Sequence, residues 1–177
     1  MTIGSMLRDE VRRRARFTCE YCGTSETDAG AELTVDHFRP ISKGGADAFE
    51  NLVYCCSRCN EYKQDYWPES TSSPPLWNPR LEPAANHFAE TEDGVLYPLT
   101  QTGAATIQRL RLNRPALIAR RLRQRNERDA LVSMERYHDI VQSLERMMRQ
   151  QADLIAEQQT LLAEQRDLLR RLSRMTT

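Results

Sequence analysis

The sequence contains no long apolar run, and this absence excludes several classes of protein. No stretch approaches the roughly 18 consecutive apolar residues that a membrane-spanning helix needs, so we expect no membrane partner. The N-terminal stretch MTIGSMLRDEVRRRARF lacks the apolar core of a signal peptide, which favours a cytoplasmic protein. Thiols stay reduced in that compartment, so the five cysteines favour metal binding over disulfides.

Lysine is absent from the last part of the chain, where arginine alone carries the positive charge. The whole chain has no net charge, with 25 basic and 25 acidic residues. Residues 105–177 nevertheless hold 15 arginines against 9 acids, or about +6, which leaves about −6 for residues 1–104. An acidic first part joined to a basic arm favours a nucleic-acid partner, although such arms are equally often only solvated.

Proline and glycine are absent after Pro115, which predicts an uninterrupted helix that Asn113 and Pro115 begin. Apolar doublets recur in it every seven residues: Met147-Met148, Leu154-Ile155, Leu161-Leu162 and Leu168-Leu169. Such a repeat predicts a coiled coil, whose partner helix comes from a second copy of the chain or from another protein. A helix folded back onto the N-terminal part is the alternative.

The sequence predicts an α+β protein: a small zinc-stapled ββα domain followed by a long, mainly α-helical coiled-coil region. In the first domain we expect a basic helix over 6–17, strands at 33–35 and 52–54, and a helix from Cys56. A turn at Asp93-Gly94 indicates a hairpin. The expected segments are the metal domain 1–66, a Pro-rich irregular connection 67–103, a basic helical arm 104–128 and a coiled-coil helix 129–177.

Two cysteine pairs of the form C-x₂-C lie in the first domain. Their members are Cys19, Cys22, Cys56 and Cys59. Two intervening residues let both sulfurs of a pair turn toward one ion, and four thiolates predict a closed, structural Zn²⁺ site. The C-x₂-C spacing excludes Cys55 from the ligand set, so we interpret it as a small buried residue. Two disulfides are the competing interpretation.

Three further segments between and beside the cysteines carry a more specific pattern. They are Val35-Asp36-His37-Phe38-Arg39-Pro40, Glu50-Asn51-Leu52-Val53 and Cys59-Asn60-x-x-Lys63. With the cysteine pairs, they resemble the HNH (ββα-metal) endonuclease motif over about residues 16–65. The resemblance implies a metal-dependent endonuclease that hydrolyses phosphodiester bonds in nucleic acid.

The resemblance also implies a role for each polar residue of the motif. His37 is the general base that activates water, and Asn51, arriving on the second strand, orients its imidazole. Asp36 and Asn60 hold the catalytic cation, and two hard oxygen ligands of low charge favour Mg²⁺ or Mn²⁺ over softer metals. Asp36 and His37 alternate along a strand, so they reach one site only if the strand ends and twists there.

Arginines and one lysine are candidate nucleic-acid contacts, because basic side chains bind phosphate without reading bases. The candidates are Arg39, Lys63, Arg109, Arg111, Arg120 and Arg121. No base-reading motif is evident, so we expect double-stranded DNA to be cut with little sequence preference. The alternative functions are a non-catalytic zinc-knuckle adaptor that binds nucleic acid and recruits a partner through its coiled coil, or a purely structural coiled-coil protein.

Overall fold

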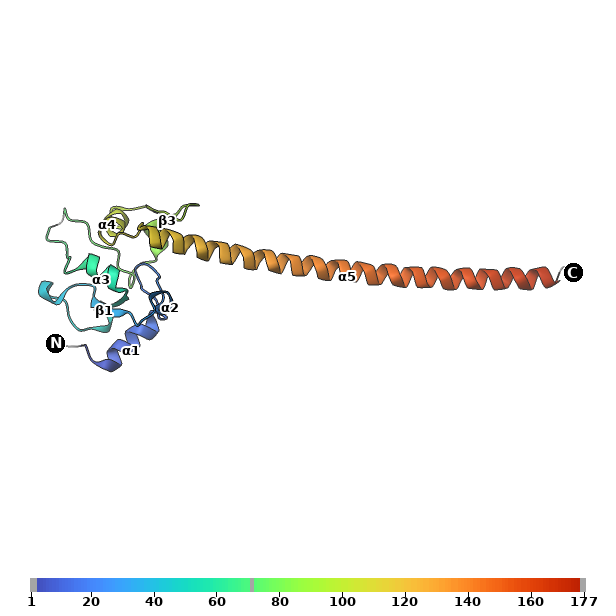
Figure 1. Ribbon diagram of the computed structural model, residues 1–177, viewed down its shortest axis with the longest axis horizontal. Coiled ribbons are helices and arrows are strands. Elements are labelled where there is room, and N and C mark those ends of the chain that lie inside the picture. Colours follow the sequence, from blue (N-terminus) through green and yellow to red (C-terminus); the bar gives the residue numbers. More distant parts are fainter. Residues whose placement is uncertain (1–2, 71, 176–177) are drawn as a thin grey trace. The chain divides into compact units, whose positions relative to one another are not determined.

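The structure is a computed structural model that describes residues 3–70 and 72–175, with side chains as far as Arg171. The chain divides into two compact units, Met1–Arg123 and Gln124–Thr177. The first unit is mixed α and β, whereas the second consists of the long helix α5 (Pro115–Met175), which begins within the first (Figure 1). Within the described part of the chain, no helix is both long and apolar enough to cross a membrane.

A ββα arrangement forms the centre of the first unit, as the sequence predicted. Strands β1 (Thr34–His37) and β2 (Leu52–Cys55) pair antiparallel, with Asp36 opposite Val53 and His37 opposite Leu52. β2 is buried along its whole length, which agrees with its continuous apolar sequence. Helix α3 (Ser57–Lys63) follows after one residue and packs against β1.

Helix α1 (Ser5–Arg14) closes one side of the hairpin through one buried valine and one arginine. Val11 is fully buried. The predicted helix over 6–17 is confirmed for residues 6–14, but it ends before Arg16 and Phe17, whose backbones are left-handed. Arg14 donates to the carbonyl oxygens of Phe49, at 2.7 Å, and of Leu52, and its guanidinium lies over the Phe49 ring. The bond to Leu52 satisfies a carbonyl at the start of β2, and the bond to Phe49 adds a donor to a carbonyl that already accepts from the Leu52 amide.

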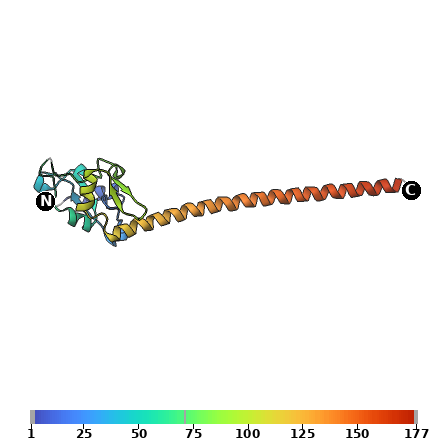
Figure 2. The same cartoon turned by 90° about the horizontal axis from the view of Figure 1, so that it is seen from above.

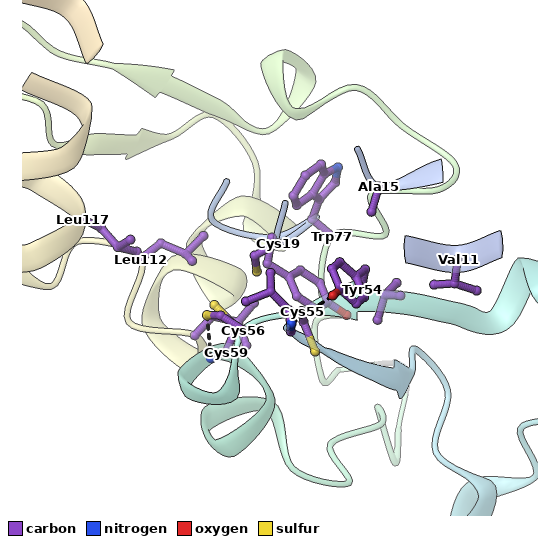
Figure 3. Close-up of a cluster of buried hydrophobic side chains, with 14 of the residues drawn as sticks. Val11, Ala15, Cys19, Tyr54, Cys55, Cys56, Cys59, Trp77, Leu112 and Leu117 are labelled. Carbon is purple, nitrogen blue, oxygen red and sulfur yellow. Dashed lines mark hydrogen bonds between the residues drawn. The ribbon is translucent and has the colours of Figure 1, made fainter. Parts of the chain in front are cut away.

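The core of the first unit surrounds β2 and the cysteines. Figure 3 shows Cys19, Cys56 and Cys59 among the buried apolar side chains of this cluster. Trp77 packs edge-on against Phe88 at 5.3 Å and Tyr21 at 6.5 Å between ring centroids. Residues after the ββα arrangement therefore complete its core.

The segment 67–103 is more ordered than the irregular connection that its prolines indicated. Its described residues up to 83 contain no helix or strand, but β3 (Phe88–Glu90) and β4 (Leu96–Pro98) then form the predicted hairpin. Helix α4 (Gln101–Arg109) is capped by Thr100, whose hydroxyl accepts from the backbone amide of Gly103. The difference has a tertiary cause: these short elements are held by contacts with the core that composition does not reveal.

Four short helical features were not predicted from the sequence, and two of them are the 3₁₀ turns η1 (Ile41–Lys43) and η3 (Ala84–Asn86). Helix α2 (Glu26–Ala29) is a single turn held by a capping box on Ser25, and η2 (Phe49–Asn51) is a 3₁₀ turn just before β2. None of the four is long enough to show helical periodicity. Asn51 therefore lies in η2 rather than on the second strand.

Helix α5 has the predicted start at Pro115 and continues beyond Arg171. Every apolar doublet of the seven-residue repeat is exposed, from Met147-Met148 to Leu168-Leu169. Thr176 and Thr177, which end the predicted coiled-coil segment 129–177, lie outside the described residues. An exposed apolar stripe of this length is a property of helices that pair. Figure 2 shows the same helix in a second view.

Candidate metal and catalytic centre

The four cysteines of the two C-x₂-C pairs lie around one point. Their sulfur atoms are all within 4.8 Å of one another, and the Sγ atoms of Cys22 and Cys56 are 3.7 Å apart. Tetrahedral Zn²⁺ with Zn–S bonds of about 2.3 Å requires sulfurs about 3.8 Å apart. The donor set and its spacing therefore fit a structural zinc ion. Among the described residues, this is the one cluster of three or more Cys, His, Asp or Glu donors so arranged.

Local backbone structure positions each pair. Cys56 is the N-cap of α3, and its Sγ accepts from the amide of Cys59 at 3.4 Å. A helix N-terminus stabilises negative charge on that sulfur. After Cys22 the chain turns through Gly23 at φ +72°, a left-handed conformation that glycine adopts without strain.

Arg114 places a positive charge against the sulfurs. Its Nη2 lies 4.0 Å from the Sγ of Cys22 and 3.9 Å from the Sγ atoms of Cys56 and Cys59. Burial lowers the pKa of Arg114, but attraction by the Cys59, Cys22 and Cys56 sulfurs outweighs it and the net pKa is raised. Four thiolates and Zn²⁺ carry a net charge of about −2, so this guanidinium offsets part of it. The sequence analysis missed this role.

The thiols also influence one another. Hydrogen bonding with Cys19 holds the pKa of Cys22 well below its usual range and lowers that of Cys56 to about 7. Hydrogen bonding with Cys22 and Cys56 raises the pKa of Cys19 well above its usual range, and the pKa of Cys59 is raised too. Two of the four thiols therefore lose their protons readily, whereas a metal must displace the protons of the other two. The fifth cysteine, Cys55, is fully buried and outside the cluster, with its Sγ 3.7 Å from the hydroxyl of Thr34. Burial raises its pKa to about 12, which suits an apolar packing residue.

Asp36 and His37 meet α3 at the end of β1. The ammonium of Lys63 lies 2.8 Å from Asp36 Oδ2 and donates to the backbone carbonyl of His37 at 2.6 Å. Lys63 has no exposed surface. Apart from this ion pair, the buried Oδ2 of Asp36 has no hydrogen-bond partner among the described residues. The strand end thus presents a carboxylate oxygen toward the helix.

Asn60 lies three residues before Lys63 on α3, which places it on the same helix face. That face is turned to Asp36, since Lys63 contacts its carboxylate. The structure shows no hydrogen bond from the Asn60 side chain to any described residue. One carboxylate and one amide oxygen are donors of the type that Mg²⁺ or Mn²⁺ retaining several waters prefers.

The imidazole of His37 is oriented by a partner that the sequence analysis did not identify. His37 Nε2 lies 2.6 Å from Asp47 Oδ1, while the predicted partner, Asn51, bonds elsewhere. The side-chain oxygen of Asn51 accepts from the backbone amide of Arg39 at 2.9 Å. Its side-chain nitrogen donates to the backbone carbonyls of Arg39 and Ala46. Asn51 therefore holds the loop that carries Asp47, and acts on the imidazole only through that loop. Asp47 lies ten residues after His37, beyond the turn η1, so no local pattern could have indicated the pair.

This loop approaches the strand end so closely that one position requires glycine. A Cβ atom at Gly45 would lie 1.9 Å from the carbonyl oxygen of Arg39 and 2.9 Å from Nδ2 of Asn51. Real side chains do not reach such distances. Gly45 thus lets Asn51 clamp the two ends of the loop together.

The candidate nucleic-acid contacts have different environments. Arg39 is exposed beside Trp67, and Arg109 and Arg111 border a groove between α3 and α4. Lys63 is buried against Asp36. Arg120 pairs with Asp28 and with the carbonyl of Gly23.

Arg121 is used within the protein rather than at its surface. The side chain is buried and donates to the carbonyls of Gly94, at 2.6 Å, and Leu112, at 3.1 Å. Burial lowers its pKa, and its Nε, Nη1 and Nη2 atoms all donate to oxygens of the protein. Phosphate contact is therefore not supported for Lys63 or Arg121, because tertiary packing has taken both charges inside. Charge density along a helix does not reveal which arginines face the core.

Comparison with known proteins gives one family. Residues 19–65 match the family described as HNH endonuclease. The matched region contains both cysteine pairs, β1, β2 and α3. No curated protein matches the chain.

Proposed function

On the premise that residues 19–65 form an HNH endonuclease domain, we propose that this protein hydrolyses phosphodiester bonds in DNA. One observation carries the proposal. At the end of β1, Lys63 of α3 contacts both the Asp36 carboxylate and the His37 carbonyl, and Asp47 lies 2.6 Å from the His37 imidazole. Asn60 precedes Lys63 by three residues on the same helix. A zinc domain that only stabilises the fold does not require an imidazole paired with a carboxylate beside Asp36.

His37 is the general base in this proposal. With Nε2 donating to Asp47, the lone pair of Nδ1 accepts a proton from water, and the resulting hydroxide attacks the phosphorus atom as the bond from phosphorus to the leaving sugar oxygen breaks. Asp47 fixes the tautomer and stabilises the positive charge that develops on the ring. Asn51 and Gly45 keep the loop of Asp47 in place.

Asp36 and Asn60 would hold a divalent cation, Mg²⁺ or Mn²⁺. When bound, such an ion supplies positive charge to the phosphoryl and leaving oxygens. The four cysteines would hold Zn²⁺, which ties α3 to the turn at Cys19 and so keeps Asn60 opposite β1. Outside this shell, Arg39 is an exposed candidate for contact with the DNA backbone.

The test is cleavage of supercoiled plasmid by zinc-loaded protein with and without added Mg²⁺. We expect nicking that requires Mg²⁺ and falls by about 10²–10⁴-fold in His37→Ala, the range for loss of a general base. Zinc content, measured by mass spectrometry, should be unchanged in that variant. Cleavage by His37→Ala at the rate of the unaltered protein would overturn the assignment. DNA binding without cleavage in any divalent metal would instead favour the zinc adaptor.

We also propose that two copies of the chain pair through α5. From Met134 to Leu169, positions spaced alternately three and four residues apart form one stripe along the helix. The stripe is apolar except at Gln151, Gln158 and Gln165. Residues 124–177 contain nine arginines and nine acids, so a second copy meets no net repulsion. A dimer brings two nuclease units to one duplex in the cytoplasm.

Sedimentation equilibrium of the full chain tests the pairing. We expect a dimer that Leu162→Asp converts to monomer, because a charge in the stripe cannot be buried unpaired. A monomer at tens of micromolar for the unaltered chain would refute it. Glu157→Ala, an exposed change on the same helix, is the matched control.

A further inference from the structure

A basic groove lies on a different part of α3 from the catalytic residues. It has a volume of about 880 Å³ and is bordered by α3, by α4 and by the extended segment near Pro74. Its charged lining side chains are Arg58, Arg109, Arg111 and Glu61. The acid is already paired with Arg58 at 3.0 Å, so the groove has an excess of positive charge.

The arginines of the groove are stacked on tyrosine rings. Arg111 lies over Tyr62, 4.7 Å from the ring centroid, and Arg109 lies over Tyr66 at 5.1 Å. Stacking of a guanidinium on an aromatic face fixes its plane while leaving its edge donors available. Both tyrosines belong to α3 or the turn after it.

Arg111 is the arginine of the groove whose guanidinium has only a ring face as a partner among the described residues. Its backbone is left-handed, with φ +48°, a conformation that costs energy for any residue except glycine. It is exposed, and its side chain has no hydrogen bond or ion pair with the described residues. Glycine would adopt this turn without strain, and the arginine found there places its guanidinium over Tyr62 at the edge of the groove.

The groove is connected to the catalytic helix through Arg109. Its Nη2 donates to the backbone carbonyl of Lys63 and to the Gln64 side chain, both at 3.2 Å. The Nε of Arg109 is buried without a hydrogen-bond partner among the described residues. The other end of Lys63 contacts Asp36. Lys63 thus contacts Arg109 of the groove with its backbone carbonyl and Asp36 of the proposed active site with its ammonium.

We propose that this groove binds the phosphodiester backbone of the DNA beyond the point of cleavage, through Arg58, Arg109 and Arg111. The inference rests on the proposed function, which supplies the DNA, and it names where the flanking backbone lies. Stacked guanidiniums present bidentate donors to phosphate oxygens. Such contacts hold the strand in register without reading bases.

The test measures DNA binding alone, so that it does not depend on cleavage. All proteins carry His37→Ala and full zinc, and bind a labelled duplex at several salt concentrations. The groove variant combines Arg58→Ala with Arg111→Gly, and glycine suits the left-handed backbone. The matched control combines Arg8→Ala with Arg16→Gly: Arg8 is an exposed helical arginine, and Arg16 is exposed at φ +51°.

We expect the groove variant to reduce the slope of log K against log salt by about 1.8, or about 0.9 for each phosphate that the protein no longer neutralises. The control should change the slope by less than half as much, and neither variant should lower the melting temperature. Equal slopes for the groove variant and the unaltered background would overturn the proposal, as would an equal reduction in the control. Absence of cleavage by the unaltered protein would refute the nuclease but not this binding surface.

Discussion

Loss of one zinc ligand should unfold the first unit, and Cys59→Ser is the sharpest change. Cys59 is fully buried, its sulfur belongs to the four-cysteine cluster, and its amide bonds the sulfur of Cys56. Serine offers no thiolate there, so the site is left incomplete. The neighbouring thiol of Cys55 cannot replace it, because that sulfur lies outside the cluster.

The expected magnitude follows from comparing two free energies. Structural zinc contributes about 10–16 kcal/mol to small domains of this kind. A domain of this size is stable by only about 5–15 kcal/mol in total. The two-stranded sheets and short helices of the first unit supply little core of their own, so the loss equals or exceeds the whole stability.

Tryptophan fluorescence reports the outcome, since Trp67 and Trp77 both belong to the first unit. We expect Cys59→Ser to lack stoichiometric zinc and to show the emission of exposed tryptophan, and a zinc-selective chelator should give the same spectrum for the unaltered chain. Cys55→Ser is the control: it should keep zinc and lose about 1–3 kcal/mol, the cost of burying a hydroxyl. A folded, zinc-free Cys59→Ser protein would refute the reasoning, and so would loss of zinc from Cys55→Ser.

Four further predictions concern the catalytic loop, the first unit and α5. Asp47→Asn should lower kcat by about tenfold or more without raising KM, and Asp47→Glu should restore part of it, as steady-state cleavage assays would show. Gly45→Ala should cost about 3 kcal/mol in urea unfolding, because its Cβ meets a backbone oxygen at 1.9 Å; an unchanged midpoint would contradict the clash. Hydrogen bonds from Arg12 lower the pKa of Glu26 from 4.5 to about 2, so its stabilisation is complete above pH 4.5 and disappears as pH falls through 2. Glu26→Gln should therefore destabilise more at pH 7 than at pH 3 in denaturant titrations. Gln158→Leu should raise the melting temperature of the paired helix, measured by circular dichroism, since a polar residue in the stripe weakens packing. An unchanged melting temperature would contradict this prediction.

The metal cluster was predictable because its information is local. Two residues between paired cysteines set the distance between sulfurs within each pair, and that spacing is visible in the sequence. The same spacing identified Cys56 rather than Cys55 as the ligand, and in the structure Cys56 lies in the cluster whereas Cys55 does not. The start of α5 at Pro115 was equally local, since proline suits only the first turn of a helix.

The partners of charged side chains were not predictable in this way. Asp47 reaches His37 only because Gly45 and Asn51 fold the loop back on the strand end. Arg121 is buried, although its neighbours in sequence are as basic as it is. Which charge faces a metal, a phosphate or a carbonyl depends on distances across the fold, and composition contains no such distances.

The amino-acid sequence by itself therefore determined the zinc ligands, the ββα order and the seven-residue apolar repeat, since each depends on spacings of a few residues. Tertiary structure alone decided that Asp47 orients the imidazole, that Arg114 faces the thiolates and that Arg111 stands over Tyr62 at the edge of a groove. These contacts join segments far apart in the chain. Only the packed core brings them within reach of a hydrogen bond or a ring face.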